Sequence, residues 1–415
     1  MKIAMVLCRT PDELPYDSRV LREAQALADA GHVVSIFIAV SGDEPQEYFV
    51  GKGIRVVAVP VRDIDGLSEC NIFRGERLPV KTLSAKIRRY PANRLYRRRY
   101  IEESVRALIR EDVEAVHCHD FHTLEIGVRA VSSRKAVLVY DSHEIFTETM
   151  AFIGLQGLLK KAFYIRQERR LIRHADRVIT VGDGCGHFLA KRYQIPMPVI
   201  VENVSEFTPE DGRPREKIRA ALEVNPQQKL LMYQGLLAPG RGVETVMEAV
   251  PLLPAEYVLA IVGFGPSEEV LRQLAGRLGI ESRVRFVGRV PRESLLSYTR
   301  SADAGVMAIQ KRCLNYYYAL PNKIFECIAA GVPFAASDFP DMRRLALNEG
   351  MGVVFNPEEP ESIAAAIKLL FSNPEDYRQK QAAIGSAATN RYNWHVVKQK
   401  LLDIYEQAGM NGRAC

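Results

Sequence analysis

The residues best suited to bind a phosphate group lie between positions 316 and 333. Pro321 suits the first turn of a helix and Gly331 suits its C-terminal stop. Free amides at the start of that helix, together with the helix dipole, would attract a phosphate, and Lys323 adds charge there. Glu326, about one turn further on, could accept hydrogen bonds from ribose hydroxyls. An ordinary surface helix with a solvated glutamate is the alternative, and the pattern leaves both open.

A second glycine-rich turn follows a predicted strand at residues 230–234. Gly240 and Gly242 allow a ligand to approach the backbone closely, and a helix predicted from Val243 supplies further free amides. Arg241 can hold a diphosphate with its fork of donors. The alternative is a simple strand-to-helix loop with a solvated arginine.

A third turn, residues 263–266 (GFGP), invites comparison with dinucleotide-binding loops. The third glycine of the G-x-G-x-x-G pattern is missing, since position 268 is glutamate, and a proline follows Gly265. The pattern therefore predicts a tight turn near the phosphate-bearing ligand rather than an NAD site.

Two patterns raise the question of a metal. Residues 117–122 (HCHDFH) hold three histidines, of which His117 and His119 would share one face of a strand. Their spacing matches no standard zinc pattern. Asp63 and Asp65 form an acidic pair that could hold a divalent ion, but a glycine follows and favours a turn. We expect no metal.

Polar residues 141–144 (DSHE) directly follow a predicted strand at 137–140. Side chains at the carboxyl end of a parallel strand project to the edge of the sheet where ligands bind. This position favours a functional role for His143 over that of a core histidine.

The elements that must position these residues alternate along the first half of the chain. Residues 19–30 carry apolar side chains at helical spacing, and Gly31 ends the helix. Alternation of strands and helices predicts a parallel sheet covered on both faces. The predicted strands are 3–7, 33–40, 55–60, 115–119, 137–140, 176–181 and 198–201.

The pattern restarts after a polar, proline-bearing linker at 205–214. The second set of predicted strands is 230–234, 257–262, 283–287, 304–308 and 333–337, followed by an amphipathic helix at 393–407. The fold class is therefore α/β with two Rossmann-like domains, at 1–204 and 205–390, and a C-terminal helical segment at 391–415. Ligands of this architecture bind in the cleft at the carboxyl ends of the strands.

Bulk composition supports a globular, cytoplasmic protein. The 415 residues are 47% hydrophobic and 26% charged, enough for two ordinary domains. The seven cysteines are scattered and odd in number, which is typical of reduced thiols. The N-terminus does not resemble a signal peptide, and no apolar run reaches the ~20 residues of a spanning helix.

A strongly basic segment predicts attraction to an anionic membrane surface. Twelve basic residues against three acidic ones lie between positions 74 and 110, interleaved with Tyr90, Tyr96 and Tyr100. A second stretch combines Leu158, Leu159 and Phe163 with the basic residues Lys160, Lys161, Arg166, Arg169 and Arg170. Anionic headgroups attract such segments. A solvated basic face is the alternative, and a nucleic-acid partner is not expected because no nucleic-acid motif is present.

Motifs that run in order along nearly the whole chain resemble those of the retaining glycosyltransferases of family 4, which adopt the GT-B fold. They are 17–20 (DSRV), 30–34 (AGHVV), 141–144 (DSHE), 175–181 (ADRVITV), 201–203 (VEN), 283–288 (RVRFVG) and 392–394 (YNW). The resemblance implies two Rossmann-like domains facing across a cleft, with a C-terminal helix that crosses back to the first.

The resemblance also implies residue roles. The catalytic set would be His143, Arg241 and Lys323. The donor-binding set would be Gly240, Gly242, Gly265, Phe286, Val287, Leu320, Pro321, Asn322 and Glu326. The candidates on the acceptor side are Asp17, Arg19, His119, Asp120 and Glu144.

The chain departs from the family pattern at three places. The family has two glutamates separated by seven residues: Glu326 matches the second, but Tyr318 takes the place of the first. A basic pair commonly holds the diphosphate: Arg241 matches one member and Leu236 replaces the other. Residues 15–17 (PYD) replace the glycine pair of the first loop.

The implied activity is retaining transfer of a sugar from a UDP- or GDP-sugar to a glycan or lipid-linked acceptor, in the synthesis of cell-surface polysaccharide or glycolipid. The resemblance implies no cofactor, since cationic side chains would replace a metal. The enzyme would be cytoplasmic or peripheral on the inner face of the membrane. The alternatives are a nucleotide-sugar epimerase and an inactive GT-B protein that only binds a sugar nucleotide.

Overall fold

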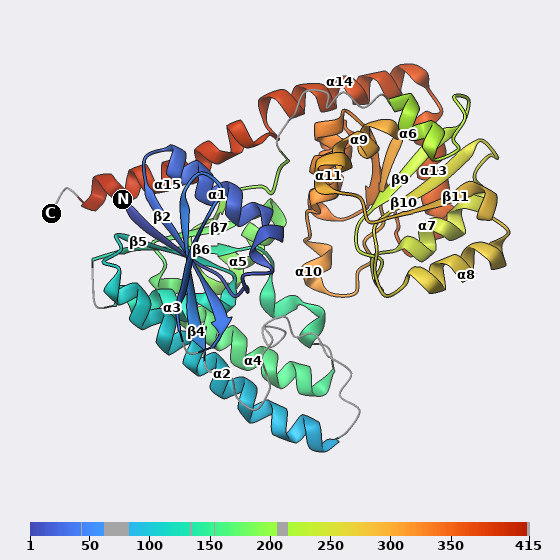
Figure 1. Ribbon diagram of the computed structural model, residues 1–415. Coiled ribbons are helices and arrows are strands. Elements are labelled where there is room, and N and C mark those ends of the chain that lie inside the picture. Colours follow the sequence, from blue (N-terminus) through green and yellow to red (C-terminus); the bar gives the residue numbers. More distant parts are fainter. Residues whose placement is uncertain (43, 62–82, 133–134, 153, 206–214, 413–415) are drawn as a thin grey trace. The chain divides into compact units, whose positions relative to one another are not determined.

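The computed structural model describes all of the 415 residues except 43, 62–82, 133–134, 153, 206–214 and 413–415, and it leaves the side chains at 41, 83–94, 155–156 and 409–412 undescribed. Asp63 and Asp65, most of the predicted linker, and the basic side chains between 74 and 94 lie outside the described part. The chain forms two compact units, Met1–Val201 with Lys398–Cys415, and Glu202–Val397 (Figure 1).

The first unit is built on a sheet in the order β3-β4-β2-β1-β5-β6-β7-β8. All of its described strand pairs are parallel except β3 with β4. The central strand β1 is fully buried after its first residue, as expected of a strand covered on both faces. The strands are β1 (Lys2–Val6), β2 (Val33–Ser41), β3 (Gln46–Val50), β4 (Ile54–Val61), β5 (Ala115–His119), β6 (Val137–Ser142), β7 (Arg177–Thr180) and β8 (Val199–Ile200).

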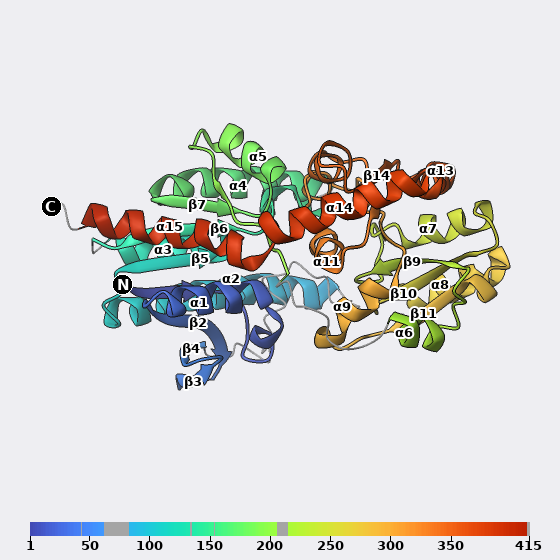
Figure 2. The same cartoon turned by 90° about the horizontal axis from the view of Figure 1, so that it is seen from above.

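Helices cover both faces of this sheet (Figures 1 and 2). The apolar core beneath α2, α3 and α4 takes in Val116, Cys118, Leu138 and Tyr140. Their neighbours in sequence face α1 and α15 instead, because successive strand residues point to opposite faces. The helices are α1 (Ser18–Asp29), α2 (Leu83–Arg110), α3 (Phe121–Val131), α4 (Leu155–Leu171), α5 (Asp183–Tyr193) and α15 (Trp394–Gly412).

Helix α1 carries charge on its buried face. Val20, Ala24 and Leu27 repeat at helical spacing and are fully buried. Arg19 and Glu23 lie on the same face and are also buried. Buried charges require partners, so the sheet beneath this helix must supply them.

The second unit contains a parallel sheet in the order β11-β10-β9-β12-β13-β14. Its strands are β9 (Lys229–Gln234), β10 (Tyr257–Val262), β11 (Val284–Gly288), β12 (Ala304–Met307), β13 (Phe334–Ser337) and β14 (Gly352–Phe355). One core packs under α7, α8 and α13, and a smaller one under α6 and α9. The helices are α6 (Arg215–Ala221), α7 (Val243–Ala249), α8 (Glu268–Leu278), α9 (Arg292–Ser301), α10 (Leu314–Tyr317), α11 (Asn322–Ala330), α12 (Pro340–Arg343), α13 (Pro360–Phe371) and α14 (Pro374–Asn390).

The prediction of an α/β fold with two Rossmann-like domains is confirmed, with two corrections to the sheets. The first sheet is not wholly parallel: residues 46–50 form an antiparallel edge strand, and Gly51 and Gly53, both with positive φ, turn the chain back into β4. The second sheet has a strand that was not predicted, β14, at the edge opposite β11. Among the described residues, no helix is both long enough and apolar enough to cross a bilayer.

Candidate active site

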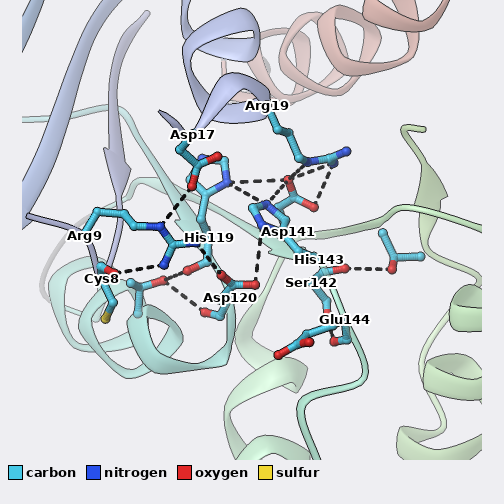
Figure 3. Close-up of polar contacts among 12 residues, drawn as sticks. Cys8, Arg9, Asp17, Arg19, His119, Asp120, Asp141, Ser142, His143 and Glu144 are labelled. Carbon is cyan, nitrogen blue, oxygen red and sulfur yellow. Dashed lines mark hydrogen bonds and ion pairs between the residues drawn. The ribbon is translucent and has the colours of Figure 1, made fainter. Parts of the chain in front are cut away.

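Asp141 is the centre of a buried charge cluster in the first unit (Figure 3). It occupies the carboxyl end of β6, and Arg19 of α1 holds both carboxylate oxygens, with Nη2–Oδ1 at 3.0 Å and Nη2–Oδ2 at 2.9 Å. Burial is the largest single effect and would raise the pKa of this carboxyl, but the charge of Arg19 together with His143 and His119 outweighs it and holds the pKa well below its usual range. Arg19 also donates to the carbonyl oxygen of Val201 at 2.7 Å. The site therefore rests on a fixed, ionised carboxylate.

His143 and His119 converge on that carboxylate. His143 Nε2 lies 3.1 Å from Asp141 Oδ2, and His119 Nδ1 lies 3.2 Å from His143 Nε2. His143 Nδ1 lies 3.5 Å from Asp120 Oδ1. Burial lowers the pKa of His143, but Asp120 and Asp141 more than offset this and raise it to about 9. At neutral pH His143 is therefore a cation that donates hydrogen bonds and cannot act as a general base.

His117 extends the cluster to the C-terminal helix. As the strand pattern predicts, its ring shares a face with that of His119, and the two stack with centroids 4.3 Å apart. Its Nδ1 lies 2.9 Å from the hydroxyl of Tyr405 in α15. Burial holds the pKa of His117 well below its ordinary value, so this ring is neutral.

The cluster contains a set of potential metal ligands. Ligand atoms of Glu23, His117, His119 and Asp141 all lie within 4.8 Å of one another. Arg19, however, already forms ion pairs with both carboxylates, at 3.0 Å to Glu23 and 2.9 Å to Asp141. A divalent ion would have to displace this guanidinium, so the set fits an arginine and not a metal.

Asp120 stands at the rim of the cluster in a strained conformation. Its φ of 64° and ψ of 160° lie in a region that residues with a Cβ rarely adopt. The backbone amide of Asp120 donates to the carbonyl oxygen of Asp141 at 2.9 Å, which fixes the two strand ends together. Arg9, which the sequence analysis missed, bridges Asp17 at 3.1 Å and Asp120 at 4.0 Å. Arg9 follows β1, whose carboxyl end lies at the same sheet edge as those of β5 and β6, and this position could have indicated it.

The structure brings four of the five predicted acceptor-side residues into this cluster: Asp17, Arg19, His119 and Asp120. The fifth, Glu144, is exposed, and its carbonyl oxygen accepts a hydrogen bond from the hydroxyl of Ser142 at 2.8 Å. Its side-chain role stays a prediction.

In the second unit, the loop between β9 and α7 carries Arg241. Gly242 has a φ of 70°, and a Cβ there would lie 1.8 Å from the carbonyl oxygen of Ala308, so only glycine fits against the end of β12. Gly265 packs against the backbone of Leu237 in the same loop. The guanidinium of Arg241 lies over the ring of Tyr316, 5.1 Å from its centroid. Tight backbone packing therefore fixes the loop that presents this arginine.

Helix α11 begins one residue later than predicted, with Pro321 as its N-cap and Asn322 as its first residue. Leu320 is buried just before it. Lys323 Nζ lies 2.8 Å from Oε1 and 3.1 Å from Oε2 of Glu326. The two side chains predicted to bind phosphate and ribose are thus ion-paired with each other, and a ligand must share or break that pair.

Phe286 and Val287, predicted to border the donor, lie on the edge strand β11 beside a cavity of about 550 Å³. The guanidinium of Arg272 covers the ring of Phe286 at 4.4 Å from its centroid. Glu281, Arg285 and Tyr298 also line this cavity. The face of the Phe286 ring is thus already covered by a cation.

Comparison with known proteins identifies the family of this chain. Residues 16–201 match the family model described as a glycosyl transferase 4-like domain, and residues 214–391 match that of the glycosyl transferases group 1. A phosphatidyl-myo-inositol mannosyltransferase of Mycobacterium tuberculosis is 24% identical over 99% of this chain and 98% of its own.

Two solved structures share the fold. Sucrose-phosphate synthase from Thermosynechococcus elongatus aligns over 99% of this chain and all of its own, with a TM-score of 0.76 and 16% identity. HepE from Anabaena, in complex with UDP, aligns over 98% of this chain and 100% of its own, with a TM-score of 0.69 and 16% identity. The two family matches together run from residue 16 to residue 391, and the chain belongs to the glycosyltransferases of family 4, enzymes with the GT-B fold.

Proposed function

We propose that this glycosyltransferase moves a sugar from a UDP- or GDP-sugar to a lipid-linked or glycan acceptor, with retention at the anomeric carbon, in the synthesis of cell-surface glycolipid or polysaccharide. The observation that carries the donor proposal is the loop of the second unit, where glycine packing against Ala308 presents Arg241 beside Tyr316. An arginine presented in this way suits a diphosphate. The UDP held by HepE, a protein of the same fold, supports it.

In the proposed reaction, the bond between the anomeric carbon and the diphosphate oxygen breaks, and a bond from that carbon to the acceptor oxygen forms on the same face. The acceptor proton passes to the departing diphosphate. Charge grows on the phosphate as the sugar becomes oxocarbenium-like, and Arg241 and Lys323 stabilise it. Removing one such pre-aimed donor typically costs ~10²–10³ in rate.

The first unit supplies a cation and not a base. The raised pKa of His143 keeps its ring protonated near neutral pH, because the carboxylates of Asp120 and Asp141 outweigh its burial. A protonated ring can donate to a sugar or phosphate oxygen at the exposed edge of the cluster. With cationic side chains in these roles, the proposed mechanism uses no metal and no other cofactor.

Helix α4 supports a lipid-linked acceptor. Leu158, Leu159 and Phe163 are 56%, 74% and 62% exposed, an unusual concentration of apolar surface on one helix. The exposed basic residues Arg166, Arg169 and Arg170 follow along the helix. This combination suits insertion among anionic headgroups. The membrane prediction is wrong for two of its three tyrosines: Tyr96 and Tyr100 are buried in the core, where the Tyr100 hydroxyl donates to the Leu7 carbonyl at 2.6 Å. The side chain of Tyr90 lies outside the described part.

Co-sedimentation with vesicles tests the membrane proposal. The native protein should bind anionic vesicles more than neutral ones at low salt, and the double variant Leu159→Asp/Phe163→Asp should lose that preference. Leu369→Asp, at a 60% exposed leucine of the second unit, is the matched control and should bind as the native protein does. Equal capture by anionic and neutral vesicles at low salt would favour a soluble acceptor.

Incubation with UDP-, GDP- and ADP-sugars tests the reaction itself. A transferase should slowly release free nucleoside diphosphate from one donor, and faster when the acceptor is added. Interconversion of sugars would indicate an epimerase. Binding with no turnover in the presence of lipid and glycan acceptors would indicate an inactive sugar-nucleotide-binding protein. A thermal shift by one donor class identifies the base, because ligands raise the melting temperature by mass action.

A further inference from the structure

The second unit holds two further cationic side chains, which the sequence analysis did not single out, in a loop that is hydrogen-bonded to the loop carrying Arg241. Lys311 and Arg312 follow β12 in the loop that leads to α10, and both are exposed. Lys311 Nζ lies 4.4 Å from the ring centroid of Tyr317, and Arg241 lies over the neighbouring ring of Tyr316. Two of these cations therefore lie over the rings of two consecutive tyrosines of α10.

Arg312 is in direct contact with the loop that carries Arg241. A Cβ built on Gly240 would lie 3.0 Å from Arg312 Cγ and 3.3 Å from Tyr316 Cε2. The backbone amide of Gln310 donates to the carbonyl oxygen of Gly240 at 3.1 Å, which joins the two loops. Gly240 thus leaves the space that the stem of Arg312 occupies, close to the Tyr316 ring over which Arg241 lies.

A neutral group orients the Arg312 guanidinium. Nε and Nη2 donate to Gln310 Oε1 at 3.2 and 2.9 Å, and Gln310 Nε2 in turn donates to the hydroxyl of Thr245 at 3.3 Å. Gln310 and Thr245 are both buried. Buried Gln310 therefore positions the guanidinium of Arg312 without neutralising its charge.

Within the described part of the chain, Arg241, Lys311 and Arg312 form no ion pair with a carboxylate, whereas Lys323 is paired with Glu326. Like charges placed together repel one another, so such a group gains from a bound anion. Leu236, where the resemblance implies a second basic residue, is exposed and apolar. The site therefore has room for a cation from another loop.

We infer that Lys311 and Arg312 complete, with Arg241, the binding site for the diphosphate group of the donor. Arg312 takes over the role of the second basic residue of the family pattern, whose position is occupied by Leu236 in this chain. The inference rests on the proposed nucleotide-sugar donor. An arginine held at its Nε edge by Gln310 keeps further N–H donors for phosphate oxygens, and this fork is the geometry that favours phosphate over a single-point anion.

Calorimetric titration with a nucleoside diphosphate and with its parent nucleoside tests the site. The tightest of UDP, GDP and ADP is the probe. Arg312→Ala should weaken diphosphate binding at least about tenfold and leave nucleoside binding unchanged, because a hydrogen bond to a charged group is lost. Lys311→Ala should act in the same direction, and Arg312→Lys should recover part of the loss. Arg378→Ala, at an exposed arginine of α14, is the matched control for net charge.

The outcomes separate this inference from the proposed function. If Arg241→Ala weakens diphosphate binding while Arg312→Ala and Lys311→Ala do not, the inference is wrong and the proposed donor stands. If Arg312→Ala weakens nucleoside and diphosphate equally, the residue supports the fold of the loop and does not bind phosphate. If no nucleoside diphosphate binds the native protein at millimolar concentration, the proposed function fails as well.

Discussion

The protonation of His143 offers the most direct test of the charge cluster. The carboxylates of Asp120 and Asp141 raise its pKa from 6.5 to about 9 against the opposing effect of burial. At 1.36 kcal/mol per pKa unit, that shift amounts to about 3 kcal/mol of preference for the cation in the folded state. Because the folded pKa is above the unfolded one, this stabilisation is fully present below pH 6.5 and is lost as the pH rises through about 9.

Two variants perturb this balance differently. His143→Gln removes the titrating group. The native protein loses the stabilisation from this group as the pH rises from 6.5 to 9 and beyond, so the free energies of unfolding of the variant and the native protein should approach each other over that range. Asp120→Asn keeps the histidine but removes the coulombic effect of Asp120, which is the largest of the effects that raise the pKa, so the pKa of His143 should fall. Asp29→Asn removes the same charge from the exposed end of α1 and should leave the pKa unchanged.

NMR titration of ring-labelled histidines gives the pKa directly. The chain has eight histidines, and His143→Gln identifies the signal of His143 by its loss. The native signal should titrate near pH 9, and the Asp120→Asn signal at lower pH. Urea unfolding at several pH values measures the accompanying change in stability. A His143 signal that titrates at or below 6.5 would refute the reasoning, and so would an Asp120→Asn variant with an unshifted signal.

Four further predictions follow from the two sites. Arg241→Ala should lower turnover at least about tenfold through loss of a charge-assisted contact to the diphosphate; unchanged steady-state kinetics and donor affinity would remove Arg241 from the site. Glu326→Ala should weaken nucleoside diphosphate binding in calorimetry, and a change in sugar selectivity alone would contradict the ribose role. Asp120→Gly should have a free energy of unfolding in urea about 1–3 kcal/mol higher than that of Asp120→Ala, since only glycine relieves the strained backbone; equal free energies would show that the conformation costs nothing. Chelator-treated enzyme should keep its activity in the donor-release assay, whereas loss and recovery with a divalent ion would establish a metal.

Much of the fold could be predicted because buried parallel strands appear as short apolar runs. The runs 115–119 and 257–262 coincide with β5 and β10. The two strands that were missed lie at sheet edges, where this signal weakens. β3 is largely exposed, and its turn with glycines at 51 and 53 was the overlooked hairpin pattern. β14 spans Gly352–Phe355, no shorter than β12 and β13, and was missed although its residues are mostly buried.

The charge cluster could be predicted only in part, because partners in a buried network are set by topology. Position at a strand end indicated His143, whereas His119 and Asp120 were candidates from the family resemblance. The role of Arg19 depends on Asp141, which lies 122 positions away, and no local pattern joins the two. Arginine on the buried face of an amphipathic helix is nevertheless a readable signal, since a charge there demands a partner from the sheet. Glu23, one turn later on the same face, gives the same signal.

The donor loops show the opposite case, in which a local pattern was read too simply. Lys323 and Glu326 were assigned to phosphate and ribose separately, yet residues three apart on a helix face one another and pair when their charges are opposite. The structure shows that pair at 2.8 Å. Donor binding must offset the loss of this ion pair, because a phosphate that binds Lys323 separates it from Glu326, which then binds the ribose without its partner. Arg312, oriented by neutral Gln310, carries no such cost, and this difference favours the proposed role of Arg312 beside Arg241 in binding the diphosphate.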